Sequence, residues 1–193
     1  SFRFNEAELR QFHEDEVWGG LQAMLDCDVP IVAQIEGNCM GAGVEIASCC
    51  DIRIAGASAR FGAPIARLGF PMAPREAQLV AGTLGEAVAR QMLLEAATFS
   101  AAEMQACGFL SRVVTKDAVA AETRASAGRI AALAPQAARL NKQTLRALKS
   151  PSTLAGYAQA AMESIVDGAY GYADSAEHRE GIDAFLAKRA PNF

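Results

Sequence analysis

The sequence has no long hydrophobic run and few residues that bind metals. No uninterrupted apolar stretch in its 193 residues approaches the roughly 18 residues that a membrane-spanning helix needs, so we expect no membrane segment. It contains only two histidines and five cysteines, an odd number with no Cys-x-x-Cys spacing. These counts argue against a zinc site and against a disulfide framework. We expect reduced thiols in a cytoplasmic protein that holds no metal.

An excess of positive charge is also absent. Lysine and arginine total 18 against 22 aspartate and glutamate residues, and the formal net charge is −4. Nucleic-acid-binding proteins usually carry a basic face, so we expect no nucleic-acid partner. Hydrophobic residues make up 51% of the chain, which is enough for a substantial core. With no internal repeat, the length predicts one domain, residues 1–193.

The first half of the chain predicts alternating helices and strands from its apolar spacing, caps and turn residues. The expected elements are a helix capped by Asn5 and ending near Cys27, a buried strand at 31–35, a short helix at 44–50, a second strand at 52–55 and an extended segment at 60–64. A glycine-rich turn separates the first strand from the short helix. This order indicates an α/β arrangement.

The second half predicts mostly helices. The expected elements are helices at 76–84 and 86–96, a short helix with a Ser100–Glu103 capping box that stops at Gly108, a strand at 113–114, and helices at 117–133, 135–149, 153–167 and 174–189, the last opening on an apparent second capping box at 174–177. We therefore expect an α/β core over about 1–133 and a helical region over 134–193.

The glycine-rich turn, Gly37 to Gly43, is the main candidate for a functional site. A strand, a glycine turn and a helix leave backbone N–H groups pointing outward, where the helix dipole adds positive charge. Such a site can receive a phosphate or an oxyanion. The turn lacks the Gly-Lys-Ser/Thr of a P-loop and the Gly-x-Gly-x-x-Gly of a dinucleotide site. Two interpretations remain: an anion site, or glycines that allow tight packing of strand on helix.

Four blocks of the sequence resemble the crotonase (enoyl-CoA hydratase/isomerase) family, in order and over nearly the whole chain. They are Pro30 to Ala47 with Cys50 to Ala55, Ala59 to Pro64 with Leu68-Gly69, Glu95 to Val114, and Glu180 to Arg189. The resemblance implies a crotonase-like ββα superhelix core with a C-terminal helical region that forms trimers. It also implies an N-terminal part of the fold that this chain lacks.

The resemblance implies an oxyanion hole made of two backbone N–H groups. One donor falls on Ala42, between Gly41 and Gly43, and the other lies upstream of Ser1. Hydratases of the family hold water between two glutamates. Glu45 matches the first, whereas Ile65 stands in place of the second, so standard two-glutamate hydration is not expected. Two interpretations of Glu45 remain: it acts alone as an acid or base, or its charge only complements the helix dipole.

Four further residues are candidates for substrate binding. Arg75 and Glu76 lie where the family lines its acyl pocket, so they either recognise the acyl group or form a solvated helix start. Lys188, with Lys142, matches basic positions near the coenzyme A phosphates, or is a surface lysine. Asp51 is expected to anchor the local backbone.

The expected function is that of an acyl-CoA-processing enzyme that stabilises a thioester enolate or oxyanion. Coenzyme A enters as part of the substrate, and no separate cofactor is expected. The resemblance implies a homotrimer or a dimer of trimers. The alternatives are a non-catalytic member of the family that binds CoA thioesters and a helical protein-interaction module without affinity for coenzyme A.

Overall fold

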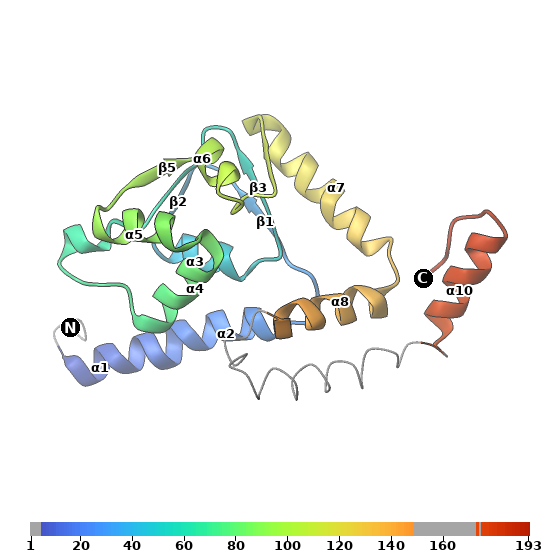
Figure 1. Ribbon diagram of the computed structural model, residues 1–193, viewed down its shortest axis with the longest axis horizontal. Helices are drawn as coiled ribbons and strands as arrows, with labels where there is room; N and C mark the ends of the chain where they lie inside the picture. Colours follow the sequence, from blue (N-terminus) through green and yellow to red (C-terminus); the bar gives the residue numbers. More distant parts are fainter. Residues whose placement is uncertain (1–4, 149–172, 174) are drawn as a thin grey trace. The chain divides into compact units, whose positions relative to one another are not determined.

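The computed structural model describes residues 5–148, 173 and 175–193 (Figure 1). The chain divides into two compact units, and each is described by itself. The first comprises residues 1–27 and 31–125, and the second comprises residues 28–30 and 126–193. The division falls inside helix α7 (Val119–Ala131).

Two three-stranded sheets form the framework of the first unit. The first sheet has the order β1-β3-β6 and is entirely parallel, and in the second, of order β2-β4-β5, β2 runs parallel and β5 antiparallel to β4. The strands are β1 (Val32–Ile35), β2 (Asn38–Met40), β3 (Ile52–Gly56), β4 (Arg60–Gly62), β5 (Thr98–Ser100) and β6 (Arg112–Val114). Because β1 and β3 each feed a strand of the other sheet, the chain builds successive ββα units, as the resemblance implies.

Helices cover these sheets (Figure 1). The α-helices of the first unit are α1 (Glu6–Gln11), α2 (Trp18–Asp26), α3 (Ala42–Cys49), α4 (Pro74–Leu84), α5 (Glu86–Leu94) and α6 (Ala101–Ala106), and short 3-10 turns are η3 (Pro64–Leu68) and η4 (Lys116–Ala118). Helix α3 packs against both α2 and α4. Helices α3 and α4 therefore lie side by side in this unit.

Local chemistry explains where several helices begin. The Asn5 side chain accepts a hydrogen bond from the Glu8 N–H (3.1 Å), which confirms the predicted cap of α1. The predicted capping box is also confirmed: the Ser100 hydroxyl accepts from the Glu103 N–H, and the Glu103 carboxylate accepts from the Ser100 N–H. Gly108 follows with φ +84°, in agreement with the predicted stop.

The N-terminal helix contains a π-helical stretch that the sequence does not predict. Residues Phe12–Val17 form the π-helix η2, which joins α1 to α2. One extra residue per turn is accommodated there, and such insertions often occur at functional sites. The stretch carries His13, whose partner lies far away in the sequence.

A continuous apolar core lies between the sheets and helices of the first unit. Phe61 on β4 and Phe109 after α6 are fully buried and meet edge to face, with ring centroids 6.0 Å apart. The Arg53 guanidinium lies over the Phe109 ring and donates a hydrogen bond to the Phe109 carbonyl. Asp51 accepts a hydrogen bond from the Ile31 N–H (2.7 Å), so it anchors the backbone as predicted.

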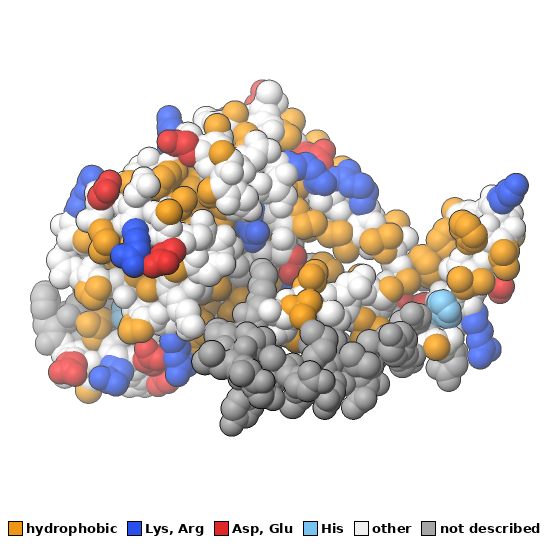
Figure 2. Space-filling view, in the orientation of Figure 1, with side chains coloured by type: hydrophobic (Ala, Val, Ile, Leu, Met, Phe, Trp, Pro, Cys, Tyr) orange, Lys and Arg blue, Asp and Glu red, His pale blue; other side chains and the backbone are white. Residues whose placement is uncertain are grey.

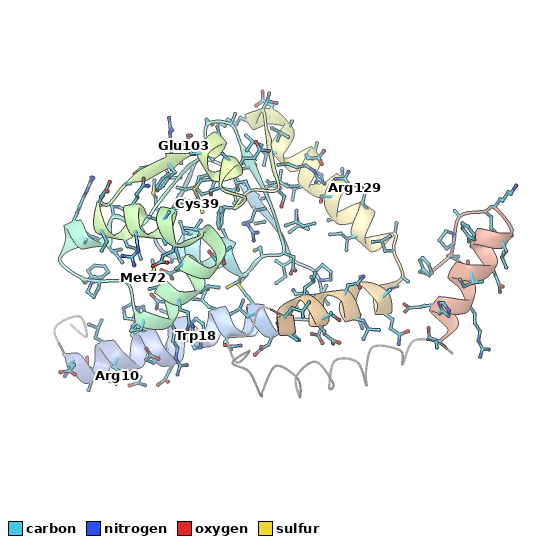
Figure 3. The ribbon with its side chains drawn as sticks, in the orientation of Figure 1. Arg10, Trp18, Cys39, Met72, Glu103 and Arg129 are labelled. Carbon is cyan, nitrogen blue, oxygen red and sulfur yellow. The ribbon has the colours of Figure 1, made fainter. Side chains whose placement is uncertain are left out.

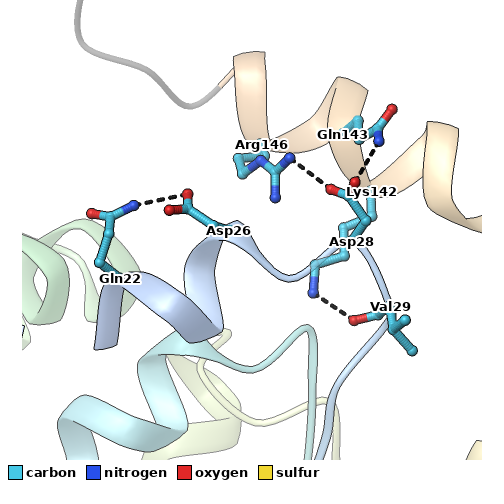
Figure 4. Close-up of polar contacts among 7 residues, drawn as sticks. All are labelled: Gln22, Asp26, Asp28, Val29, Lys142, Gln143 and Arg146. Atoms are coloured by element: carbon cyan, nitrogen blue, oxygen red, sulfur yellow. Dashed lines mark hydrogen bonds and ion pairs between the residues drawn. The ribbon is translucent and has the colours of Figure 1, made fainter. Parts of the chain in front are cut away.

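The second unit contains α8 (Pro135–Leu148) and α10 (Ala176–Leu186). Asp28 receives hydrogen bonds from Gln143 (2.7 Å) and Arg146 (2.8 Å) on α8, which lower the pKa of its carboxyl group (Figure 4). Ser175 caps α10 by accepting from the His178 N–H (3.1 Å), whereas Asp174, the first residue of the predicted capping box at 174–177, lies outside the described residues. Glu177 accepts a hydrogen bond from the Gln136 N–H (2.6 Å).

Most predicted elements are present, with shifted ends. The sequence did not predict β2 and β5, and the helix predicted at 153–167 lies outside the described residues. None of the helices in the described ranges is both long enough and apolar enough to cross a membrane. Acidic and basic side chains are interspersed on the face shown in Figure 2.

Candidate active site

The glycine turn presents the start of α3 to solvent. Gly41 has φ +51° and ψ −118°, a conformation that residues with a side chain rarely adopt, and its N–H donates to the Gly62 carbonyl on β4 (2.8 Å). Gly41 therefore shapes the turn, and its N–H is already used. Among the described residues, the N–H groups of Ala42 and Gly43 donate no hydrogen bond. These two groups, at an exposed helix start, are available to an anionic oxygen.

Glu45 lies one turn into α3 and is buried, with 6% of its surface exposed. Its carboxylate accepts no hydrogen bond from any described residue. Burial, and to a smaller extent the negative charge of Glu76, raise the pKa of Glu45 to about 7, and His13 opposes the shift. A carboxyl group with this pKa can both give and take a proton near neutral pH.

Glu76, in the first turn of α4, is the second buried carboxylate of this region. Only 3% of its surface is exposed, so it is not part of a solvated helix start. Its Oε1 atom lies 2.8 Å from Nδ1 of His13, whose side chain is 25% exposed. The structure thus brings Glu45, Glu76 and His13 together from α3, α4 and η2. The sequence predicted Glu76 only as a residue for the acyl pocket, and it did not predict His13.

Arg75 contacts other residues than Glu45, Glu76 and His13. Its guanidinium forms an ion pair with Glu14 (3.1 Å) and lies over the ring of Trp18, which Figure 3 labels at the start of α2. The Arg75 side chain is 56% exposed. Of the two interpretations given for Arg75, the structure agrees with a solvated residue at the start of a helix.

An apolar cleft of about 470 Å³ opens next to the start of α4. Its lining residues come from η3, the loop before α4 and the helices α4 and α5: Ile65, Ala66, Gly69, Phe70, Pro71, Met72, Ala77, Leu93 and Leu94. Ile65 thus forms part of an apolar wall. Ala77, the residue after Glu76, lines the same cleft.

The remaining predicted residues lie in the second unit. Lys188 is exposed in the turn after α10, and Lys142 donates a hydrogen bond from its Nζ atom to the Val29 carbonyl (2.9 Å). The five cysteines, all within the described residues, form no disulfide. Burial raises the pKa of Cys39 and Cys49 to about 11, so both thiols stay protonated at neutral pH.

Comparison with known proteins agrees with this architecture. The family model for enoyl-CoA hydratase/isomerase matches residues 4–193, nearly the whole chain. The chain belongs to the enoyl-CoA hydratase/isomerase family. This result confirms the crotonase resemblance and the crotonase-like α/β fold.

Curated relatives in this family are similar in sequence, and solved structures of family members are similar in fold. The chain is 32% identical to the 2,3-dehydroadipyl-CoA hydratase of Escherichia coli, over 92% of this chain and 67% of that protein. It is 31% identical to the crotonyl-CoA hydratase of Syntrophomonas wolfei, over 96% of this chain and 69% of that protein. A crystal structure of an enoyl-CoA hydratase/carnithine racemase from Magnetospirillum magneticum superposes with a TM-score of 0.89 at 34% identity, covering 100% of this chain and 69% of that one. The chain spans about two thirds of the length of the curated relatives it matches.

Proposed function

We propose that the protein processes acyl-CoA thioesters through an enolate or oxyanion intermediate, with Glu45 as the group that exchanges the proton. One observation carries the proposal: a buried glutamate with a pKa near neutrality stands one turn behind two unused N–H groups at the start of α3. General acid–base catalysis requires a pKa close to the working pH, and an oxyanion requires fixed N–H donors.

In this mechanism the thioester carbonyl oxygen lies against the Ala42 N–H. Glu45, when ionised, takes a proton from the carbon next to the carbonyl, and the electron pair of that C–H bond moves into the enolate. The N–H groups stabilise the negative charge on the oxygen, and Glu45 then returns the proton to carbon. Removing one such donor typically costs roughly 10²–10³ in rate. No cofactor enters these steps, because coenzyme A is part of the substrate.

The remainder of the substrate is assigned from the apolar cleft and from the resemblance to the family. The apolar cleft lined by Ile65 and Ala77 would take a hydrocarbon acyl chain. Lys188 would contact the phosphates of coenzyme A, as in the family resemblance. Assembly as a homotrimer or a dimer of trimers belongs to the same proposal, and light scattering on the full-length protein tests it.

Deuterium exchange tests the central step. The full-length protein is incubated in D₂O with butyryl-CoA, and deuterium at the carbon next to the carbonyl is followed by NMR. We expect exchange by the wild type and a loss of roughly 10²–10⁴-fold in the Glu45→Gln variant, the usual contribution of a general acid or base. Equal exchange by both proteins would refute the role of Glu45.

A non-catalytic member of the family that binds CoA thioesters is the second candidate function. It is favoured by Ile65, which cannot transfer a proton at the position of the second glutamate. Binding is measured by isothermal titration with coenzyme A and butyryl-CoA. Tight binding without exchange or turnover of any thioester would establish this alternative, and no binding at all would favour a protein-interaction module.

A further inference from the structure

The Glu76 carboxylate is buried, and burying a charged group lowers the stability of the folded state unless the group has a partner. A buried charge requires a partner, and hydrophobic residues of similar volume usually serve stability equally well. Its partner, His13, comes from the π-helical stretch η2, 63 positions earlier in the chain. The pair lies beside a second buried carboxylate, and two like charges close together oppose each other's ionisation. Arrangements of this kind are concentrated at functional sites.

We propose that Glu76, held by His13, is the second acid–base carboxylate of the site and that it activates water for addition to an enoyl-CoA thioester. The inference rests on the proposed function and deepens it. Glu76 lies on α4. By the resemblance, the second glutamate of hydratases corresponds to Ile65, which lies on η3. His13 is a positioning residue, because it acts through its hydrogen bond to Glu76.

Geometry connects Glu76 to both parts of the site. Helix α4 packs against α3, which carries Glu45, and the residue after Glu76 lines the apolar cleft that also contains Ile65. Glu76 is therefore next to a residue of the cleft wall and on a helix that packs against the helix of Glu45. In the proposal, a water molecule bound beside Glu76 adds to the double bond of an enoyl chain in the cleft.

The proposed mechanism assigns opposite roles to the two carboxyl groups. Burial and the charge of Glu76 raise the pKa of Glu45 to about 7, so Glu45 can hold a proton near neutral pH and serves as the acid, whereas Glu76, 2.8 Å from Nδ1 of His13, serves as the base. Ionised Glu76 takes a proton from water while the water oxygen bonds to the β-carbon of the enoyl group. The π electrons move to the thioester, and Glu45 gives its proton to the α-carbon. The site then holds protonated Glu76 and ionised Glu45, and one proton passed between them, through solvent, restores the start.

The test compares two reactions in the full-length protein. Hydration is followed by the loss of the enoyl thioester absorbance of crotonyl-CoA, and deuterium exchange at the α-carbon of butyryl-CoA reports Glu45 alone. For Glu76→Gln we expect hydration to fall by at least about 100-fold while exchange changes by less than about threefold. For Glu45→Gln we expect both to fall. The control Glu86→Gln removes an exposed carboxylate that is paired with Arg90 at the start of the neighbouring helix, and both reactions should persist.

Each result separates the two proposals. If wild type shows neither exchange nor hydration, the proposed function fails. If wild type exchanges deuterium but hydrates no enoyl thioester, or if Glu76→Gln still hydrates crotonyl-CoA within about threefold, the role of Glu76 is refuted while that of Glu45 stands. Equal loss of both reactions in Glu76→Gln would also refute it, because a structural defect acts on both.

The pH dependence of kcat/KM tests the role of His13. The alkaline limb should report Glu45 in its acid form, and His13 lowers the pKa of that group. His13→Gln should therefore move the alkaline limb to higher pH, and a profile that superposes on the wild type would refute the positioning role. The titratable or charged groups that act on Glu45 and Glu76 or lie next to them are His13 and Glu14 on η2, Arg75 on α4 and Cys49 on α3, whereas Glu86 and Arg90 on α5 pair with each other at the surface.

Discussion

Replacing Glu45 by glutamine should stabilise the protein at alkaline pH while it removes proton exchange. The pKa of Glu45 is raised from 4.5 to about 7, so the folded state binds this proton more tightly than the unfolded chain. Below pH 4.5 the carboxyl group is protonated in both states, so it adds no pH dependence to the free energy of unfolding. Between pH 4.5 and 7 the unfolded chain loses the proton first, and the free energy of unfolding therefore falls as the pH rises. Each pKa unit corresponds to 1.36 kcal/mol, which gives a penalty of about 3 kcal/mol above pH 7.

Glutamine has nearly the same shape and cannot ionise, so Glu45→Gln should remove this penalty. Urea unfolding of both full-length proteins at pH 5, 6, 7 and 8, at one protein concentration, measures the difference. We expect a variant that is more stable by about 1 kcal/mol at pH 5 and by about 3 kcal/mol at pH 8. Parallel pH profiles for the two proteins would refute the burial of an ionisable Glu45. The Glu86→Gln variant provides the matched control, since Glu86 is exposed.

Three substitutions test the framework around the site. Gly41→Ala should cost about 1–3 kcal/mol in urea unfolding, because a side chain is strained at φ +51° and ψ −118°, whereas Gly82→Ala in an exposed part of α4 should be neutral or stabilising. Phe61→Ala should cost about 3–5 kcal/mol, since the ring is fully buried against Phe109, and a smaller loss would show that the core collapses around the gap. Ser100→Ala should lower the free energy of unfolding by about 1 kcal/mol through loss of the α6 cap, and an unchanged urea midpoint would count against that cap.

The sequence predicts those parts of the fold that depend on neighbours in the chain. The cap at Asn5, the capping box at Ser100 and the stop at Gly108 are local patterns, and the structure confirms all three. The strands β2 and β5 were missed because each has only three residues and is defined by its pairing with β4. Such pairing is set by the tertiary fold and leaves little periodicity to detect.

The same distinction between local patterns and long-range contacts applies to the candidate site. Glu45 and the Ala42 N–H follow from the strand, turn and helix, which are consecutive in the sequence. The contact of Glu76 with His13 joins positions 63 residues apart, and an acidic residue in the first turn of a helix is ordinarily exposed. Only the packing of α4 shows that Glu76 is buried. The role assigned to Gly41 also required the structure, because its N–H bond to Gly62 crosses between strand ends.

The π-helical stretch Phe12–Val17 has a consequence for how such a site can arise. Successive residues of an α-helix are rotated by roughly 100° about its axis. Inserting or deleting one residue therefore rotates all preceding side chains about that axis, relative to the rest of the helix. Deleting Glu16 should convert η2 into regular α-helix and rotate His13 away from Glu76 relative to α2. The partner of Glu76 is thus set by the number of residues between His13 and α2 as well as by their identity. A relative with the same histidine and glutamate but one residue fewer in this stretch would keep both groups and lose their contact.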